Sequence, residues 1–569
     1  MSSAASLQNQ STSRVAKPVR FFARPDAIWT LLYLLLMACT GAFFMADTVD
    51  YVQAAVLRDQ GINYVFWDFR HLFWRPLGWL FLHFSKWFVH YDDMADARSM
   101  VTRTFIVLNW AAGLASLLLQ RRILLRFCKP SWALNLTLAT FLFAQGFMNY
   151  VHSGSSYIFG LGWLVVGLFC LVAEPAELTN LRILVGALAL ALSVCFWFPY
   201  FFALLGALSA PLFVSRQNWR AVAKACTLCL LFGLAFYGAV ILGLRLHTLA
   251  DIRAWVATGA SDVAGVRGPT RTIFGLARSF INMGQDGVLY KRFLLHDPYN
   301  PVSLSQLVRL SILKLGVFYL LMLAMVWELG RRRRSVLAFF ALGMLPVITF
   351  GLYWYGGDVE RYLPLYPFFF VGLGCALEAS RQLWARTIAL VFLLVVIISN
   401  LSVMSAFSIH RQGKRSEDRL QALLPVYKPH SRIVLVDIHD ELENFSRSFP
   451  LQPIVNRSDF SFYPALNPGT PQNLHWKQEF SKTTSRAWSE GGDIWLSKRF
   501  FDQKPGSDSA WVEGDDKHVK WTDVYRFFRE VDTGISVGAN DGFVLLMPDD
   551  KNHKLVDALA DSDPISTPR

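Results

Sequence analysis

Two aspartates, Asp47 and Asp50, stand where a long apolar segment has just ended, in the stretch MADTVDYVQAAV (45–56). A carboxylate at such a boundary is either a solvated helix flank or a group that removes a proton from a substrate. The spacing Asp-x-x-x-Tyr predicts that Asp47 and Tyr51 lie on one face of a helix, with Asp50 pointing elsewhere. Asp47 is therefore the first candidate for a general base, and Asp50 is the alternative.

A second polar stretch, YWYGGDVERYLPLYPFFF (353–370), leads into a late apolar segment. Its Arg361 is a candidate for binding phosphate, because the guanidinium fork pairs with phosphate oxygens in a bidentate, charge-assisted way. Alternatively, Arg361 anchors the segment at the headgroups or pairs with Asp358 or Glu360. Glu360 in turn either orients Arg361 or contacts a substrate.

Four further residues near these stretches are candidates for contacts with a substrate. His71 and Arg75 lie in HLFWRPLGWLF (71–81), where His71 suits a sugar or acceptor contact and Arg75 suits either a substrate or an interfacial anchor. Tyr51 and Tyr362 suit ligand contacts, although tyrosines at membrane boundaries commonly form an aromatic belt. We find no HExxH and no paired-cysteine metal motif, so we predict that no metal is required.

The elements that must position these residues are membrane helices. Of the 569 residues, 53% are hydrophobic and only 17% are charged, against about 25% in soluble proteins. The mean hydropathy is +0.33. Long apolar runs fill residues 28–408, and the chain turns polar after His410. We predict a polytopic α-helical membrane protein with a C-terminal extracytoplasmic α/β or α+β domain.

About eleven segments are long enough to be candidate membrane spans. They are 28–46, 103–120, 132–150, 155–173, 182–198, 199–214, 222–246, 306–328, 335–353, 362–380 and 387–408. With eleven spans, the basic stretches before the first span and after the second, sixth, eighth and tenth all fall on one side, which the positive-inside rule makes cytoplasmic. The net charge of +13 is then a topology signal rather than a nucleic-acid footprint.

This topology divides the chain into three parts. Residues 1–27 form a cytoplasmic tail, 28–410 form the membrane domain with long outer loops at 47–102 and 247–305, and 411–569 form the outer soluble domain. Both outer loops are rich in apolar and aromatic residues, which favours helices lying in the interface plane. In the soluble domain, RIVLVDI (432–438) and GFVLLMP (542–548) predict strands. Its tryptophans suit either a core or stacking on sugars: Trp476, Trp488, Trp495, Trp511 and Trp521.

The motifs and their order resemble the GT-C superfamily of integral membrane glycosyltransferases, such as protein O-mannosyltransferases and lipid A aminoarabinose transferases. An acidic residue just past the first span, a tyrosine, Arg-Pro-Leu at 75–77 and ERYLPLYPFF (360–369) carry the resemblance. It implies a polyprenyl-phosphate sugar as donor and a catalytic carboxylate in the first outer loop, here Asp47 or Asp50. Many relatives have a second acid beside the first, where this chain has Thr48.

The resulting prediction is a glycosyltransferase of the bacterial inner membrane. It moves a hexose or pentose from the lipid-linked donor to a glycan, lipid or protein acceptor on the extracytoplasmic face, without a required cofactor. The alternatives are a transporter or flippase of lipid-linked glycans, which would show internal repeats or charged groups near the midplane, and a polymerase or ligase of surface glycans. A non-catalytic assembly protein would not need eleven spans.

Overall fold

The computed structural model describes most of the helical part of the chain and the ordered elements of its C-terminal part. The described residues are 24–42, 47–61, 66–89, 94–174, 176–215, 218–257, 268–283, 310–380, 382–406, 419, 421–434, 462–463, 476–502, 527–538 and 542–560. Trp511 and Trp521 lie outside these residues, and so does the side chain of Trp476.

Each of the predicted spans contains helix within its described residues. In chain order these are α1 (Arg24–Cys39), α4 (Met94–Phe127), α5 (Trp132–Phe143) with α6 (Gln145–Val151), α7 (Tyr157–Leu171), α8 (Asn180–Phe196), η2 (Phe198–Ala203) with α9 (Leu204–Val214), α10 (Trp219–Gly243), α14 (Leu310–Arg332), α15 (Arg334–Tyr353), η5 (Glu360–Leu365) with α16 (Tyr366–Ala379), and α17 (Leu383–Ala406). Among the described residues, six helices are long and apolar enough to cross a membrane, and five apolar helices are shorter. The prediction of a polytopic α-helical membrane protein is confirmed, whereas the count of eleven crossings stays a prediction.

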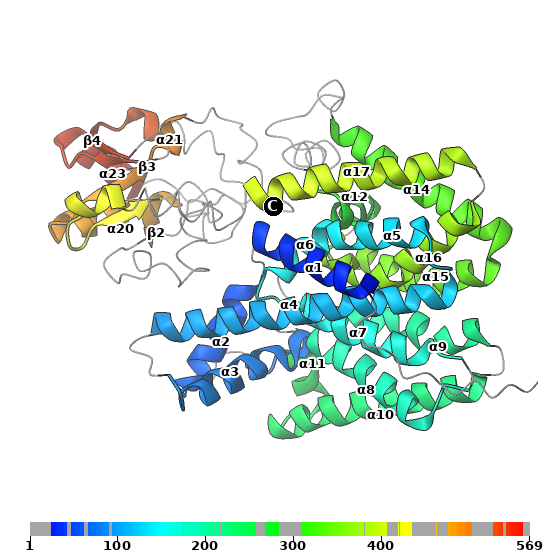
Figure 1. Cartoon of the computed structure of the whole chain (residues 1–569). Helices are drawn as coiled ribbons and strands as arrows, with labels where there is room; N and C mark the ends of the chain where they lie inside the picture. Colours follow the sequence, from blue (N-terminus) through cyan, green and yellow to red (C-terminus); the bar gives the residue numbers. More distant parts are fainter. Residues whose placement is uncertain are drawn as a thin grey trace, which may run out of the picture.

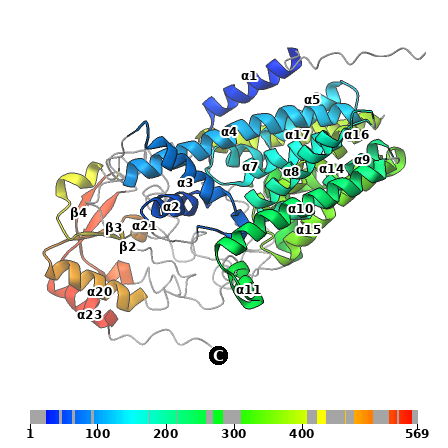
Figure 2. The ribbon, with the colours of Figure 1, turned by 90° about the horizontal axis from the view of Figure 1, so that it is seen from below.

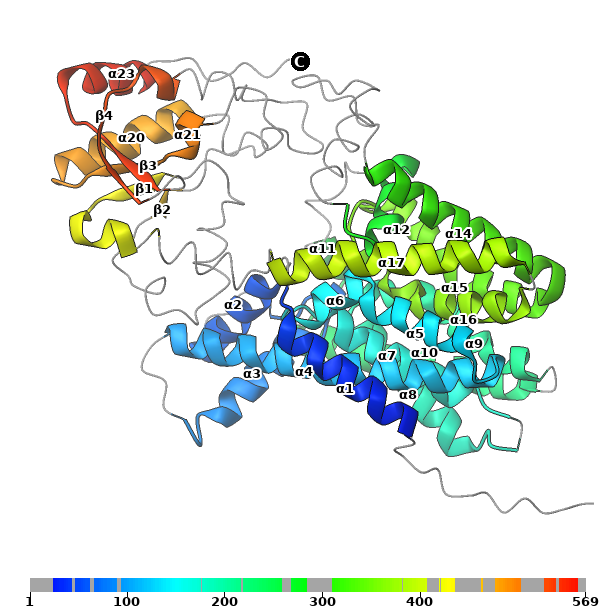
Figure 3. The ribbon, with the colours of Figure 1, turned by 45° about the horizontal axis from the view of Figure 1, so that its top comes forward.

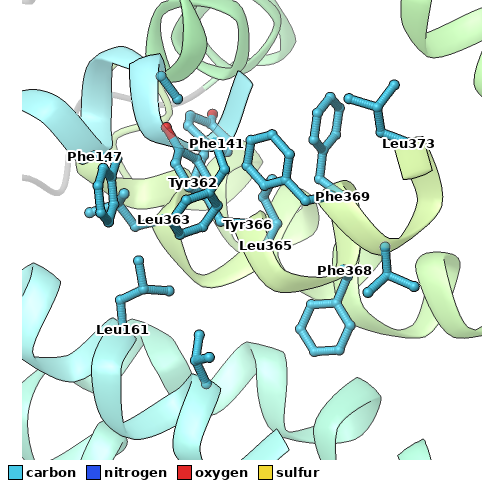
Figure 4. Packing of buried hydrophobic residues seen from close by; sticks show 14 of the residues in the cluster. Phe141, Phe147, Leu161, Tyr362, Leu363, Leu365, Tyr366, Phe368, Phe369 and Leu373 are labelled. Atoms are coloured by element: carbon cyan, nitrogen blue, oxygen red, sulfur yellow. The ribbon is translucent and has the colours of Figure 1, made fainter. Parts of the chain in front are cut away.

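The helices form one layered bundle. Figure 1 shows α14 and α17 on one side, α4 and α7 in the middle, and α8 and α10 on the other side. Of the six long apolar helices, the most buried is the segment Glu360–Ala379, which ends in α16 and has 89% of its apolar stretch inside the protein. Figure 4 shows Tyr366, Phe368 and Phe369 of this helix packed among side chains of neighbouring elements, including Phe141. The first turns of α16 are therefore buried in the core of the bundle.

One predicted span, 132–150, is broken between α5 and α6. Ala144 has extended backbone (ψ 136°), so the α5 carbonyls near it lose their helical partners. The amide of Asn400 on α17 replaces one of them by donating to the carbonyl of Phe143 at 2.7 Å, and it also donates to the Phe280 carbonyl, outside α5, at 2.7 Å. An unpaired backbone group in a membrane interior costs several kcal/mol, which explains a fully buried asparagine in the middle of an apolar helix.

Charged side chains tie several basic stretches together at one end of the bundle, here called the basic end. Asp26 of α1 is buried and binds both Arg121, at 2.7 Å, and Arg122 at the end of α4. Glu378 at the end of α16 binds Arg333 at 3.1 Å, and so joins the α14–α15 turn to the same end.

The remaining basic stretches join this end through other contacts. Lys224 near the start of α10 donates to Asn180 at the start of α8, at 3.1 Å. Arg386 of α17 stacks over the ring of Trp132 at the start of α5, 5.3 Å from its centroid. The structure thus gathers at one end the start of α1 and the described parts of the four later stretches that the sequence predicts to be cytoplasmic, whereas residues 14–23 of the first stretch lie outside the described residues. Their position in the cell stays a prediction.

Short helices from the two predicted outer loops lie at the opposite end. The first loop contributes α2 (Thr48–Asp59), η1 (Phe69–His71) and α3 (Trp74–Ser85), and the second contributes α11 (Leu249–Ala257) and α12 (Pro269–Phe280). Figure 2 shows α2 and α3 at the end of the bundle away from α9. On and after α3, Phe84, Trp87 and Phe88 are 45%, 70% and 85% exposed. This apolar surface is what an interfacial helix presents to lipid.

The C-terminal part forms a small mixed sheet with helices, beside the helical bundle rather than within it (Figure 3). The strands are β1 (Arg432–Val434), β2 (Phe462–Tyr463), β3 (Ile494–Ser497), β4 (Thr533–Val537) and β5 (Phe543–Leu546), in the order β2-β1-β3-β5-β4. β1 is parallel to β2 and β3, whereas β5 is antiparallel to β3 and β4. β1 covers the first three residues of the predicted run 432–438, whose remainder lies outside the described residues, and β5 lies within the predicted run 542–548. Trp495 is buried in this unit, as a core residue would be.

Two glycines allow α9 and α15 to pack closely. A Cβ placed on Gly206 of α9 would lie 2.6 Å from the Cα of Gly343 on α15 and 2.8 Å from the ring of Phe368. Small residues at such crossings let helix backbones approach in a membrane, where dispersion replaces the hydrophobic effect. Gly233 of α10 differs, because a Cβ there meets no atom within 4 Å.

We expect Gly206→Ala to destabilise the bundle by about 1–3 kcal/mol, since backbone atoms of α15 cannot move aside as a side chain would. Thermal unfolding in detergent measures this effect. Gly233→Ala is the matched control and should unfold at or above the wild-type temperature, because alanine favours a helix. Equal behaviour of the two variants would contradict the close approach of α9 and α15.

Candidate active site

The carboxylate of Asp47 is the centre of the polar cluster opposite the basic end. Asp47 is the residue immediately before α2, but its side chain makes no capping hydrogen bond to the helix backbone. Instead, its Oδ2 accepts hydrogen bonds from the hydroxyls of Tyr51 at 3.0 Å and Tyr157 at 2.7 Å. Asp47 is exposed, whereas both tyrosines are buried. This carboxylate is therefore held for something other than capping, and the predicted shared face of Asp47 and Tyr51 is confirmed.

Behind Tyr51 lies a buried polar network. The Tyr51 hydroxyl is 2.9 Å from Nε2 of His71, and Nδ1 of His71 is 2.8 Å from the Ser156 hydroxyl. Arg75 lies over the Tyr51 ring, 5.5 Å from its centroid, and binds Asp68 at 3.2 Å. Burial lowers the pKa of His71 to about 4, although the carboxylates of Asp68 and Asp47 oppose the shift. His71 is therefore neutral at neutral pH and carries one N–H.

A buried turn between α6 and α7 positions Tyr157. Its irregular backbone is satisfied by side chains from three helices. Asn109 of α4 donates to the carbonyls of Ser153 and Ser155 at 2.8 and 2.7 Å. Trp74 of α3 donates to the Gly154 carbonyl at 2.8 Å, and Thr48 of α2 accepts from the Gly154 amide at 3.0 Å. Thr48, where many relatives of the resembled family have a second acid, here holds this turn.

The second predicted stretch forms a charged group just before α16. The side chain of Arg361 is 11% exposed, and its Nε is 3.9 Å from Asp358. Glu360 is buried and accepts a hydrogen bond from the Tyr150 hydroxyl at 2.5 Å. Burial and the neighbouring Glu360 carboxylate raise the pKa of Asp358 well above its usual range, although Arg361 and Arg278 oppose the shift. The raised pKa favours the protonated form of Asp358.

Three aromatic side chains join the two stretches, which are about 300 residues apart in the chain. The Tyr157 ring packs edge-on to Tyr150, at 4.9 Å, and against Trp197, at 4.6 Å. Arg361 lies over the Trp197 ring, 6.0 Å from its centroid. Asp47 is close enough for its charge to interact with that of Arg361. The structure therefore brings the predicted carboxylate and the predicted phosphate-binding arginine into one site.

The other predicted residues lie in or beside this cluster. Asp50 is exposed in the first turn of α2. His71 and Arg75 are 3% and 7% exposed and bind protein groups. Tyr362 is fully buried, and its hydroxyl donates to the backbone carbonyls of Gly356, at 2.7 Å, and Thr272, at 3.2 Å. Contacts of these residues with a substrate stay predictions.

Sequence reasoning missed five residues of the site. Tyr150, Tyr157 and Trp197 connect the two stretches, Asp68 pairs with Arg75, and Arg278 lies beside Gly357. A signal was present in the turn HSGSSY (152–157), whose small polar residues interrupt two apolar segments at the same end as Asp47. Arg278 of α12 also reaches the site, donating to the Gly357 carbonyl at 3.3 Å. The second outer loop thus contributes a cation that its sequence did not single out.

This arrangement can support transfer of a group from a phosphate. An exposed, fixed carboxylate can remove a proton from a hydroxyl, and the nearby guanidinium groups can stabilise charge that develops on phosphate oxygens. Among the described residues, no cluster of three or more His, Cys, Asp or Glu side chains is arranged to hold a metal ion. Independence from metal stays a prediction.

Comparison with known proteins finds a likeness in overall fold. No model of a known protein family matches the chain, and no curated protein matches it. The crystal structure of ArnT from Cupriavidus metallidurans bound to undecaprenyl phosphate matches with a TM-score of 0.46 and 10% identity, covering 91% of this chain and 96% of that chain. The apo state of the same protein matches with a TM-score of 0.44 and 10% identity, covering 93% and 99%.

The buried neutral His71 predicts a specific pH dependence of stability. Its folded pKa, about 4, lies below the ordinary 6.5, so the unfolded chain binds a proton more readily. The contribution of His71 to the free energy of unfolding should therefore fall as the pH drops from about 6.5 towards 4, and it should level off below pH 4. The total loss should be roughly 3 kcal/mol, at 1.36 kcal/mol per pKa unit. Thermal midpoints of wild type and His71→Gln across this range measure it.

The His71→Gln protein should lose less stability over this range than wild type. His83→Gln is the control, because His83 is an exposed histidine in the last turn of α3. This variant should follow the wild-type curve. Parallel curves for wild type and His71→Gln would show that His71 is not held neutral.

Proposed function

We propose that this protein is an integral membrane glycosyltransferase, which moves a sugar from a polyprenyl-phosphate donor to an acceptor hydroxyl at the end of the bundle that carries Asp47. The observation that carries the proposal is the exposed Asp47 carboxylate, fixed by two buried tyrosines beside Arg361. The motif resemblance to the GT-C superfamily supports the same class of reaction.

In this reaction Asp47 acts as the general base. It takes the proton of the acceptor hydroxyl as that oxygen attacks the anomeric carbon of the sugar. A positioned base contributes typically 10²–10⁴-fold to such a step. Asp47 suits this role better than Asp50, because two buried hydroxyls orient its carboxylate. The carboxylate remains exposed, so the proton can pass to water after transfer.

Arg361 and Arg278 act on the leaving group. The bond from the anomeric carbon to the phosphate oxygen breaks, and negative charge develops on the lipid phosphate. Arg361 lies at the start of α16, at the boundary of an apolar helix, where a phosphate attached to a membrane lipid would lie. A proton on Asp358 would leave this group of two acids and two arginines with a net positive charge, which favours a phosphate.

The basic end sets the orientation of the protein in the membrane, and the donor lipid would reach the site from the bilayer. If the basic end faces the cytoplasm, as the positive-inside rule expects, the site faces the extracytoplasmic side of a bacterial inner membrane. We propose no resident cofactor, and the acceptor is a glycan, lipid or protein. The C-terminal unit is proposed to lie on the same side and to help hold the acceptor.

We expect Asp47→Asn to reduce sugar transfer by at least about 100-fold while the protein still folds, because the amide cannot accept the proton. Release of undecaprenyl phosphate from a panel of undecaprenyl-phosphate-linked hexoses and pentoses measures transfer, since this leaving group is common to every sugar. Asp59→Asn, in the same helix, is the matched control. Asp50→Asn decides between the two acids: loss of activity there, with retention in Asp47→Asn, would move the base to Asp50.

We expect Arg361→Gln to weaken binding of undecaprenyl phosphate by about 10–100-fold, since a hydrogen bond to a charged group contributes about 1.5–3 kcal/mol. Arg361→Lys should lie between this variant and wild type, because lysine keeps the charge and loses the fork. Titration of the purified protein with undecaprenyl phosphate gives the affinities. Arg220→Gln, an exposed arginine at the basic end, is the control, and an equal loss there would indicate only a general effect of charge.

A further inference from the structure

The Asp47 carboxylate is held by one of its two oxygens. Tyr51, from α2, and Tyr157, from the start of α7, both donate to Oδ2. Within the described part of the chain, no hydrogen bond reaches Oδ1. The tyrosines are 1% and 3% exposed, whereas Asp47 is exposed, so both donors approach from the protein side. This leaves Oδ1 as the oxygen that is available to a substrate.

The number of hydrogens on each group fixes which atom donates and which accepts in the network behind Tyr51. The Tyr51 hydroxyl has one hydrogen, which it gives to Asp47, so its oxygen accepts from Nε2 of His71 at 2.9 Å. A neutral imidazole has a single N–H, so Nδ1 accepts from the Ser156 hydroxyl at 2.8 Å. Nδ1 then carries no hydrogen, so its 3.3 Å approach to the Phe196 carbonyl is not a hydrogen bond. Each donor in the chain points towards Asp47, and such chains strengthen their members.

Packing prevents either tyrosine ring from swinging away from Asp47. The Tyr157 ring is enclosed by Tyr150 and Trp197, with ring centroids 4.9 and 4.6 Å away. The Tyr51 ring lies under the guanidinium of Arg75, at 5.5 Å, and beside the ring of His71. The two hydroxyls therefore keep their positions whether or not a substrate is bound, which is the preorganisation that catalysis requires.

We propose that Tyr51 and Tyr157 are positioning residues that fix Oδ2 of Asp47, so that Oδ1 is the atom that removes the acceptor proton. This inference rests on the proposed role of Asp47 as the base. In the transfer step, the acceptor oxygen bonds to the anomeric carbon and its proton passes to Oδ1. The bond from the anomeric carbon to the phosphate oxygen breaks, and its electron pair stays on the phosphate. A carboxylate that is free to rotate would misplace Oδ1, and a 1 Å misplacement can cost about 100-fold.

The test removes one hydroxyl at a time, as Tyr157→Phe and Tyr51→Phe. For each variant we expect kcat to fall about 10–100-fold with KM unchanged, since the base is misplaced and substrate binding is not. Tyr33→Phe is the matched control, because Tyr33 is also buried and its hydroxyl donates to the Trp110 carbonyl at 2.8 Å, away from Asp47. Its kcat should equal that of wild type. Thermal unfolding of the three variants separates loss of fold from loss of positioning.

A second readout needs no substrate. The infrared carboxylate bands of Asp47 are isolated by subtracting the spectrum of Asp47→Asn from that of the parent protein. Loss of one donor should shift these bands in Tyr157→Phe and Tyr51→Phe but not in Tyr33→Phe. If Tyr157→Phe and Tyr51→Phe show unshifted bands and the same kcat as the control Tyr33→Phe, the positioning role is overturned. An active Asp47→Asn protein would instead overturn the role of Asp47 as the base, and a wild-type protein that releases no undecaprenyl phosphate from any donor would overturn the proposed function, so these failures are distinguishable.

Discussion

The site depends on one constraint, which is that irregular backbone buried in a helical membrane protein must find hydrogen-bond partners. The turn between α6 and α7 satisfies it with Asn109, Trp74 and Thr48, from three different helices. These bonds fix the turn relative to α2, α3 and α4. Because Tyr157 follows the turn directly, its hydroxyl is fixed beneath Asp47 by the same bonds.

The bundle separates two kinds of charge. At the basic end, arginines pair with single carboxylates such as Asp26 and Glu378, and these pairs connect helix ends. At the opposite end, Asp47, Asp358 and Arg361 gather around buried tyrosines and a tryptophan. A charge next to an apolar helix is costly unless it is paired or solvated. The first group uses its charges for structure, whereas the second keeps an exposed carboxylate and a guanidinium close together.

Parts of the fold and site followed directly from the sequence. Apolar segments of about twenty residues predicted where the helices lie, because hydrocarbon thickness sets their length. The basic stretches predicted which helix ends lie together. The spacing of Asp47 and Tyr51 predicted that they share a face, since the α-helical repeat brings residues four apart onto one side of a helix. Tyr150 and Trp197 could not be assigned in this way, because nothing local distinguishes them from other aromatic residues at helix ends.

The sequence by itself therefore determined the membrane class, the helical segments and the two stretches that carry the charged residues, since these follow from local composition and periodicity. Only the tertiary structure decided that Asp47 and Arg361 belong to one site, that Thr48 holds a turn, and that both tyrosines bind the same carboxylate oxygen. The reason is physical: these relations join helices that are distant in the chain, and they depend on packing angles and close approaches such as that of Gly206 and Gly343, which no local pattern encodes.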